Sequence, residues 1–156
     1  MKKIPVTIPV ESYLPSELSP LRAAIVEQAK EATAGAYAPY SHFHVGAAIR
    51  LASGTIIKGA NQENAAFSSG TCAERSAVFA VGANYKGETI THIAIAAEKG
   101  GDFQSLPISP CGACRQALLE YEQMQHAPIE VILYGSEAVY ILPSVASTLP
   151  LCFTEF

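Results

Sequence analysis

Hydrophobic and polar residues follow two different periods along the chain, and each period predicts a different kind of element. Residues 21–36 place apolar side chains at helical spacing, and Ser19 and Pro20 before them are typical of a helix start. Residues 44–61 hold two β-rich runs on either side of a turn at 52–54, which predicts a hairpin. The ordered part of the chain is therefore expected to begin with a helix and a hairpin.

The second half of the chain alternates helical patterns with short apolar runs. In order, the expected elements are a helix over 72–85, a strand over 90–98, a helix over 110–123, a strand over 129–135 and a last strand over 138–142. Strands that alternate with helices favour an α/β fold, in which helices cover both faces of a buried sheet. We therefore predict a three-layer αβα sandwich with a mixed sheet of about five strands.

The chain of 156 residues fits a single domain over residues 1–156, and residues 1–18 are expected to form an extended arm. Within this arm, residues 6–10 alternate weakly like a strand. Prolines and a glutamate interrupt the opening segment, which makes it a poor signal peptide, and no apolar run approaches the roughly 18 residues of a membrane span. We expect a cytoplasmic protein with no membrane partner.

The composition and net charge bear on whether the protein binds a nucleic-acid polymer. Apolar residues make up 49% of the chain and charged residues 15%, and the net charge is -4. Proteins that hold a nucleic-acid polymer by its phosphates usually carry a basic face. The acidic balance therefore argues against such a polymer, although a small nucleoside remains compatible with it.

Three of the four cysteines lie where helices are expected to begin. Cys111 and Cys114 are three residues apart and share one helix face, and Cys72 has the same position on the other helix. Free backbone N–H groups and the helix dipole favour thiolates there, and reduced cysteines in a cytoplasm suggest metal or catalysis before disulfides. If the two helix starts face each other, three thiolates converge into a zinc site whose fourth position is open to water. Cys152 has no such partner and is expected to be packing.

Glu74 follows Cys72 by two residues and can sit over the open position without ligating the metal. Zinc lowers the pKa of bound water to about 7 in favourable sites, and a nearby carboxylate can move the released proton. Three thiolates weaken the metal as a Lewis acid, so we expect Arg75 and Arg115 to reach a sulfur each and draw charge away. Cysteine, glutamate at plus two and a later P-C-x-x-C match the zinc deaminase signature, with Cys72 where that signature writes histidine.

With these residues the chain resembles the cytidine deaminases of the small, homotetrameric type. The motifs are AYAPYSHFHVGAA at 36–48, NQENAAF at 61–67, CAER at 72–75 and SPCGACRQ at 109–116. The resemblance runs from about Leu21 to Phe153. It implies a hydrolase that acts on the C–N bond of a cyclic amidine, with one Zn²⁺ per subunit. Such an enzyme converts cytidine and deoxycytidine to uridine and deoxyuridine with release of ammonia, in pyrimidine salvage.

Asn61 and Glu63 are two residues apart at the end of a strand, so their side chains point the same way. An amide and a carboxylate can hold a sugar hydroxyl, although the spacing alone favours a plain polar strand end. The resemblance implies that this pair holds the ribose 3′-hydroxyl. Phe43 reads as core from its position alone, whereas the resemblance places it beside the nucleoside.

Further substrate contacts come from the resemblance alone. It implies that the backbone N–H of Ala73 and a carbonyl near Ser109 or Pro110 read the polar edge of the base. Phe153 resembles a C-terminal aromatic residue that reaches into a neighbouring subunit and stacks on the pyrimidine. Phe67 stands where tyrosine is more familiar, so a hydroxyl is missing there. If Phe67 or Phe153 completes a neighbour's pocket, an isolated subunit should be nearly inactive.

Three other functions stay open. A deaminase of a nucleoside-like antibiotic such as blasticidin S would share the zinc site, but the Asn61 and Glu63 pair favours an ordinary ribose. A polynucleotide-editing deaminase is opposed by the acidic balance. A non-enzymatic zinc-stabilised binding module would need a fourth protein ligand, and it would leave Glu74 without a role. The histidines at 42, 44, 92 and 126 are expected to be exposed or structural.

Overall fold

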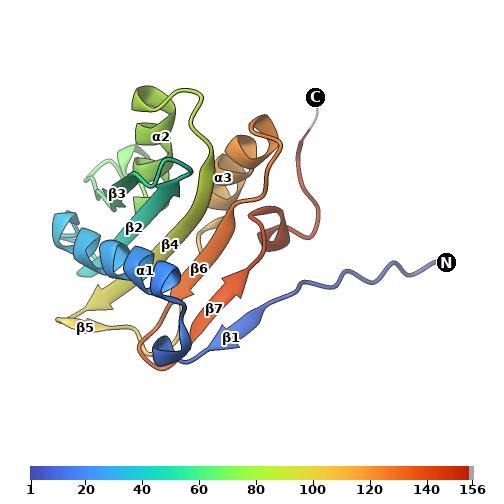
Figure 1. The fold of residues 1–156 in the computed structure, drawn as a ribbon. Coiled ribbons are helices and arrows are strands. Elements are labelled where there is room, and N and C mark those ends of the chain that lie inside the picture. Colours follow the sequence, from blue (N-terminus) through green and yellow to red (C-terminus); the bar gives the residue numbers. More distant parts are fainter. Residues whose placement is uncertain (155–156) are drawn as a thin grey trace.

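A single mixed sheet forms the middle layer of the protein, shown as a computed structural model that describes residues 1–154 (Figure 1). Its strands within that range are β1 (Glu11–Tyr13), β2 (Phe43–Leu51), β3 (Ile56–Ala60), β4 (Ile90–Lys99), β5 (Asp102–Phe103), β6 (Glu130–Tyr134) and β7 (Val139–Leu142). The strand order is β1-β7-β6-β4-β2-β3, and β5 pairs with β4 outside this path. Strands β4 and β6 run parallel, and the other pairs are antiparallel.

Helices cover both faces of this sheet (Figure 1). The α-helices are α1 (Pro20–Ala32), α2 (Ala73–Asn84) and α3 (Gly112–Met124), and short 3₁₀ turns are η1 (Pro15–Glu17), η2 (Thr33–Gly35), η3 (Phe67–Ser69) and η4 (Ala146–Thr148). Successive residues of one strand point to opposite faces of the sheet: Ala48 packs in the cluster beneath α1, and Ile49 packs in the cluster beneath α2 and α3. The predicted α/β sandwich of three layers is confirmed.

The predicted number of about five strands is too low, because seven are present within residues 1–154. Strand β5 has only two residues, and β1 has three. The strand predicted for residues 6–10 is wrong: residues 1–10 are extended without pairing, and β1 begins at Glu11 against β7. Pro9 cannot donate a ladder hydrogen bond, so the paired segment starts after it.

The first helix begins as its sequence predicts. The Ser19 side chain accepts a hydrogen bond from the Arg22 backbone N–H at 3.4 Å. The Arg22 guanidinium then donates to both oxygens of Glu130 on β6, at 2.9 and 2.8 Å. Such a bidentate pair fixes direction as well as distance, and it ties the start of α1 to the sheet.

Helices α2 and α3 start at the same end of the sheet because of the connections around β4. Helix α2 leads into β4, and α3 joins β4 to the parallel strand β6. Gly59 on β3 lets α2 lie close, since a Cβ there would be 2.5 Å from both the Ala73 oxygen and the Ala77 nitrogen. The third helix begins at Gly112 with Cys111 as its cap, two residues later than predicted from Pro110.

The helices of residues 1–154 are too short or too polar to cross a bilayer.

Candidate metal centre and active site

Three cysteines converge where helices α2 and α3 begin. Cys72 caps α2, Cys111 caps α3, and Cys114 lies in the first turn of α3. The Sγ atoms of Cys72 and Cys111 are 3.8 Å apart, those of Cys111 and Cys114 are 3.4 Å apart, and all three lie within 4.8 Å of one another. A tetrahedral zinc ion with sulfur at about 2.3 Å requires S–S separations of roughly 3.8 Å. The donor set and its spacing therefore fit zinc, and the predicted meeting of the two helix starts is confirmed.

The cluster is electrostatically prepared for a cation. A hydrogen bond from the Cys114 thiol and the nearby Arg75 guanidinium lower the pKa of Cys72 to about 5. The same hydrogen bond, together with burial, raises the pKa of Cys114. The lowered pKa of Cys72 favours a thiolate there, which is the form of cysteine that binds zinc.

Glu74 lies in the first turn of α2, next to the sulfurs, and only 3% of it is exposed. Burial is the main cause that raises the pKa of Glu74, and the negative charge of Cys72 adds to it. A carboxyl whose pKa is raised can gain and lose a proton nearer neutral pH than an exposed one. The side chain is therefore suited to moving protons at this place.

Of the two arginines predicted to reach the sulfurs, Arg75 contacts a sulfur and Arg115 binds backbone carbonyls instead. Contact with the Cys72 sulfur raises the pKa of Arg75, which lies beside the cluster as predicted. Arg115 points elsewhere: its Nε donates to the Pro110 carbonyl and its Nη1 to the Thr148 carbonyl, each at 2.8 Å. Adjacent residues on a helix point about 100° apart, so Arg115 does not share the face of Cys114. It fixes the backbone before Cys111.

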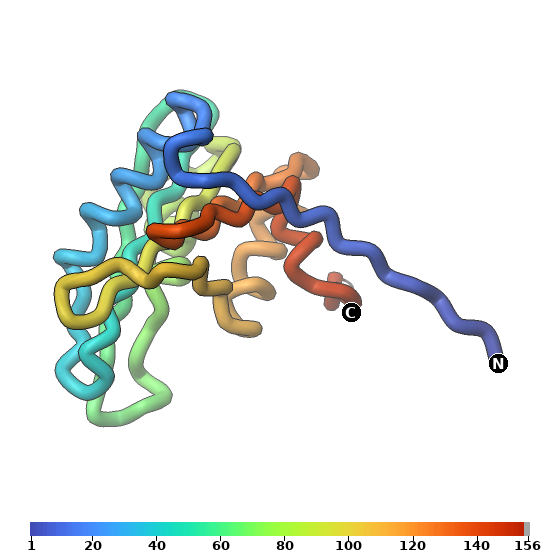
Figure 2. The backbone as a smooth tube through the Cα atoms, turned by 90° about the horizontal axis from the view of Figure 1, so that it is seen from below, coloured from blue at the N-terminus to red at the C-terminus, as the bar shows by residue number. Residues whose placement is uncertain are grey.

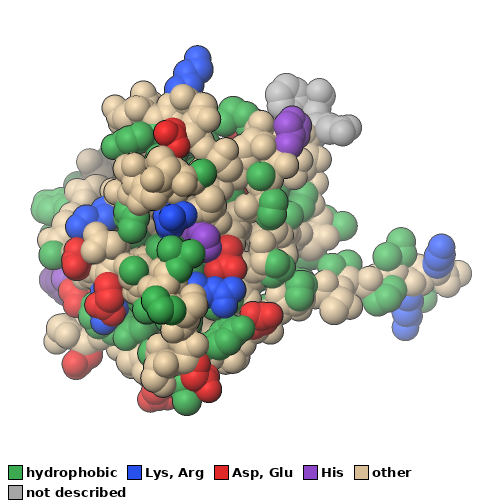
Figure 3. Space-filling model, in the orientation of Figure 1, with side chains coloured by type: hydrophobic (Ala, Val, Ile, Leu, Met, Phe, Trp, Pro, Cys, Tyr) green, Lys and Arg blue, Asp and Glu red, His purple; other side chains and the backbone are tan. Residues whose placement is uncertain are grey.

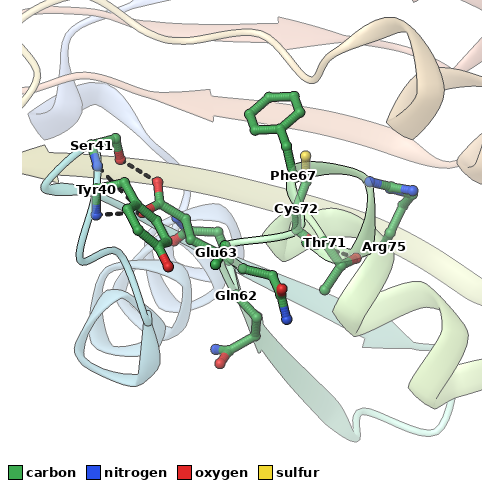
Figure 4. A pocket seen from close by; sticks show the side chains of 12 residues that line it. Tyr40, Ser41, Gln62, Glu63, Phe67, Thr71, Cys72 and Arg75 are labelled. Atoms are coloured by element: carbon green, nitrogen blue, oxygen red, sulfur yellow. Dashed lines mark hydrogen bonds between the residues drawn. The ribbon is translucent and has the colours of Figure 1, made fainter.

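A pocket of about 640 Å³ opens beside Cys72 (Figure 4). Its lining residues are Tyr40, Ser41, Asn61, Gln62, Glu63, Asn64, Ala65, Phe67, Gly70, Thr71, Cys72 and Arg75. Cys72 and Arg75 lie at one end, and Tyr40, Ser41 and Glu63 lie at the other (Figure 4). The pocket thus leads from the metal cluster to a polar wall.

The polar wall holds the predicted ribose-binding pair. Both carboxylate oxygens of Glu63 accept hydrogen bonds, from the Tyr40 N–H at 2.9 Å, from the Ser41 N–H at 3.3 Å and from the Ser41 hydroxyl (Figure 4). These bonds, the hydroxyl first, lower the pKa of Glu63 and keep it an acceptor. The Asn61 side chain accepts from the Val45 N–H at 2.8 Å and donates to the Phe43 carbonyl at 3.0 Å. Both side chains brace the segment that opens β2.

The remaining predicted contacts occupy different places. Phe67 stands at the pocket rim and is 97% exposed, whereas Phe43 begins β2, half-buried, outside the lining set. Ala73 is buried as the first residue of α2, where a helix presents a free backbone N–H. Phe153 is 63% exposed and outside the lining set, and its carbonyl accepts from the Gln116 side chain at 2.9 Å. Within one chain, then, Phe67 reaches the pocket and Phe153 does not.

A buried glutamate that supports this region was not anticipated from the sequence. The Glu122 carboxylate on α3 accepts three backbone N–H groups, from Ile129 at 2.8 Å, Val145 at 2.7 Å and Ala146 at 2.9 Å. It thereby holds η4, whose Thr148 carbonyl receives Arg115. The available signal was a charge on the apolar stripe that Leu118 and Leu119 form.

Comparison with known families matches residues 21–128 to the model of the cytidine and deoxycytidylate deaminase zinc-binding region. That match covers more than half of the chain and contains all three clustered cysteines and Glu74. The histidines contribute nothing to the metal cluster among the described residues.

Individual proteins show the same likeness. The cytidine deaminase of Halalkalibacterium halodurans is 39% identical over 99 residues, 64% of this chain and 70% of that protein. The cytidine deaminase of Sporosarcina psychrophila is 43% identical over 98 residues, 62% of this chain and 67% of that protein. Among solved structures, a cytidine deaminase from Burkholderia pseudomallei has a TM-score of 0.71 at 39% identity, covering 83% of this chain and 97% of that one.

Proposed function

The chain belongs to the cytidine and deoxycytidylate deaminase family, and from this premise we propose that it hydrolyses cytidine and deoxycytidine to uridine and deoxyuridine with release of ammonia. One observation carries the proposal: three sulfurs spaced for zinc lie beside a buried carboxyl, and one of them, that of Cys72, lines a pocket of about 640 Å³. Cys72, Cys111 and Cys114 would hold one zinc ion per subunit. When bound, zinc would act as a Lewis acid that makes a coordinated water acidic near neutral pH.

Glu74 is the proton shuttle in this proposal. Its carboxylate takes a proton from the attacking water and delivers it to ring nitrogen N3, which makes C4 electrophilic. The water oxygen then bonds to C4, and Glu74 carries the remaining proton of that oxygen to the exocyclic amino group. The C4–N bond breaks and ammonia leaves, so that one water is consumed for each ammonia formed. The raised pKa of Glu74 supports both steps, because the group must accept and donate at one pH.

The pocket orients the nucleoside. Asn61 and Glu63 are assigned to the ribose 3′-hydroxyl, and the Ala73 N–H to the polar edge of the base. Glu63 suits an acceptor role, since its hydrogen bonds keep it ionised. A site that fixes a 3′-hydroxyl leaves little room for a following phosphate, which favours free nucleosides over bases within a strand.

Aromatic side chains complete the pocket in this proposal. Phe43 and Phe67 flank the nucleoside, and Phe153 stacks on the pyrimidine in the site of a neighbouring subunit. The exposure of Phe153 in one chain supports a place between subunits, and we propose a homotetramer. A reducing compartment such as the cytoplasm is part of the proposal, because zinc binding requires that Cys72, Cys111 and Cys114 stay free of disulfides, as they are in the structure.

The test is ammonia release and the absorbance change on mixing purified protein with cytidine or deoxycytidine, with zinc quantified in the same sample. We expect turnover with about one zinc per chain. Dialysis against a chelator should remove the activity, and added zinc should restore it. Bound zinc without turnover of either nucleoside would refute the substrate assignment and direct the search to modified pyrimidines such as blasticidin S. Turnover without zinc would refute the metal's role.

A further inference from the structure

Of the residues 1–18 expected to form an extended arm, only residues 1–10 precede β1 and run away from the body of their own chain; these ten residues are called the arm below (Figures 1 and 2). The arm lies outside the matched region at 21–128, so the proposed activity does not account for it. Its isoleucines and valines occupy alternate positions and are all exposed: Ile4 by 79%, Val6 by 56%, Ile8 by 40% and Val10 by 50%. Alternate residues of an extended chain share one side, so the arm carries a continuous apolar stripe.

The backbone of the arm is suited to binding in a groove. Pro5 and Pro9 fix their own φ angles at values that an extended chain also adopts, and they lack an N–H, which prevents a full strand ladder. A segment with fewer free dihedral angles loses less conformational entropy on binding. The basic residues of the arm are Lys2 and Lys3, and Figure 3 shows basic side chains at its outer end.

A groove with matching properties lies on the outer side of α2 and α3. Its volume is about 710 Å³. Phe79, Tyr85, Tyr121 and Met124 give it an aromatic and apolar lining, and Phe79 and Met124 are 52% and 66% exposed. It is separate from the pocket beside Cys72, because the two share no lining residue.

Charges on the two surfaces are complementary. The groove is also lined by Glu88 and Glu120, with Lys86 as its basic residue, which gives it a net negative charge. The charged residues of the arm are Lys2 and Lys3. Ten extended residues reach on the order of 30 Å, which is about the diameter of a small domain. The arm is therefore long enough to cross onto another molecule.

We propose that the arm of one copy of this chain docks in the α2–α3 groove of a second copy. The apolar stripe lies on Phe79, Tyr85 and Met124, and the lysines approach Glu88 and Glu120. Around a two-fold axis the exchange is reciprocal, so that each dimer contains two such contacts. The contact does not depend on the proposed activity, and its test does not measure activity.

The experiment is zero-length carbodiimide cross-linking of the full-length, zinc-loaded protein, which joins an amine to a carboxylate only where they touch. We expect a covalent species of twice the chain mass on a denaturing gel. Peptide mapping of that species should join Lys2 or Lys3 to Glu88 or Glu120. In the double variant Ile4→Ser/Ile8→Ser both lysines remain and no carboxylate is added, but the stripe is lost. The yield of that species should fall roughly tenfold or more, because two buried apolar side chains contribute several kcal/mol to binding.

Two further variants make the result specific. Phe79→Ser in the groove should lower the yield as the arm variant does, whereas Leu21→Ser, on the exposed side of α1, should leave it unchanged. A link of the same residues within a single chain mass would show that the arm occupies its own groove and would overturn the proposal. So would a link to other carboxylates, the absence of any link, or a yield that survives Ile4→Ser/Ile8→Ser.

Discussion

At the scale of single residues, two buried glutamates serve opposite purposes. Glu74 is 3% exposed and Glu122 is 6% exposed. Burial raises the pKa of Glu74, so this carboxyl can exchange a proton during a reaction. The Glu122 carboxylate accepts hydrogen bonds from three backbone N–H groups, so it stabilises the fold. The hydrogen-bond partners of a buried carboxyl, more than its burial, decide whether it has a catalytic or a structural role.

Replacing Glu74 by glutamine removes the proton shuttle and keeps the shape of the side chain. We expect zinc content to stay at one per chain and kcat to fall by a factor of about 10² to 10⁴ or more. Steady-state kinetics and metal analysis on the same preparation measure both quantities. Glu137→Gln, an exposed change of the same kind, is the control. Full activity of Glu74→Gln would show that another group moves the protons.

Replacing Glu122 by glutamine puts an amide NH₂ among three N–H donors. At least one backbone donor then loses its acceptor inside the protein, so we expect the free energy of unfolding to fall by about 3 kcal/mol. Denaturant unfolding measures this change. Glu120→Gln, two residues earlier and exposed, should change stability by less than about 0.5 kcal/mol. Equal effects of the two substitutions would mean that the three hydrogen bonds to Glu122 contribute little to stability.

At the scale of elements, the site depends on how closely α2 approaches β3. Gly59 and Gly46 occupy comparable positions on the two faces of the sheet. A Cβ at Gly59 would press on Ala73 and Ala77 of α2, and a Cβ at Gly46 would press on the Ala29 carbonyl of α1. The two glycines therefore set the distances of a site helix and of a helix remote from the site.

Alanine at either glycine should cost about 1–3 kcal/mol of stability through overpacking. Only Gly59→Ala should also weaken zinc binding and raise KM, because it displaces the helix that carries Cys72 and Glu74. Thermal unfolding, a competitive zinc titration and kinetics on both variants separate the effects. If Gly46→Ala impaired zinc binding as much as Gly59→Ala, the spacing of α2 would not be the cause.

Much of this arrangement could be predicted from local sequence. The residues around the cysteines predict where α2 and α3 begin, so the metal cluster could be predicted as a unit. The turn after β2 likewise predicts where that strand ends. Short edge strands such as β1 and β5 carry too few residues for a period to show. The hydrogen-bond partners of Arg115 could not be predicted from local sequence. One of them, the Thr148 carbonyl, lies 33 residues downstream, and Glu122 positions the segment that carries it.

At the scale of the whole molecule, one charged network joins the first helix to the sheet. Arg22 donates to Glu130, and the Nε2 atom of His92 lies 3.7 Å from the same carboxylate. Burial first, then the charges of Arg50 and Arg22, lower the pKa of His92, while Glu130 opposes them. The folded protein therefore resists the proton that His92 takes up readily when the chain unfolds.

This network predicts how stability depends on pH. Since His92 has its ordinary pKa of about 6.5 in the unfolded chain and a lower one when folded, its contribution is present above pH 6.5 or so. It is lost as the pH falls through the folded pKa. We expect a smaller loss of unfolding free energy between about pH 7 and 5 in His92→Gln than in the wild type. Denaturant unfolding across this range measures it, with His42→Asn, an exposed histidine, as control. An unchanged slope in His92→Gln would contradict the argument.

The metal cluster and the pocket wall are carried by different segments of the chain. The sulfurs sit on the rigid starts of α2 and α3, whereas most of the wall comes from the loops around 40–41 and 61–71. Substitutions in those loops can change shape and polarity without moving a sulfur atom. Mutation of these loops can therefore change which nucleoside the pocket admits, while the metal-binding sulfurs keep their positions. A gene duplicate of this chain would need only loop mutations to diverge toward a new substrate.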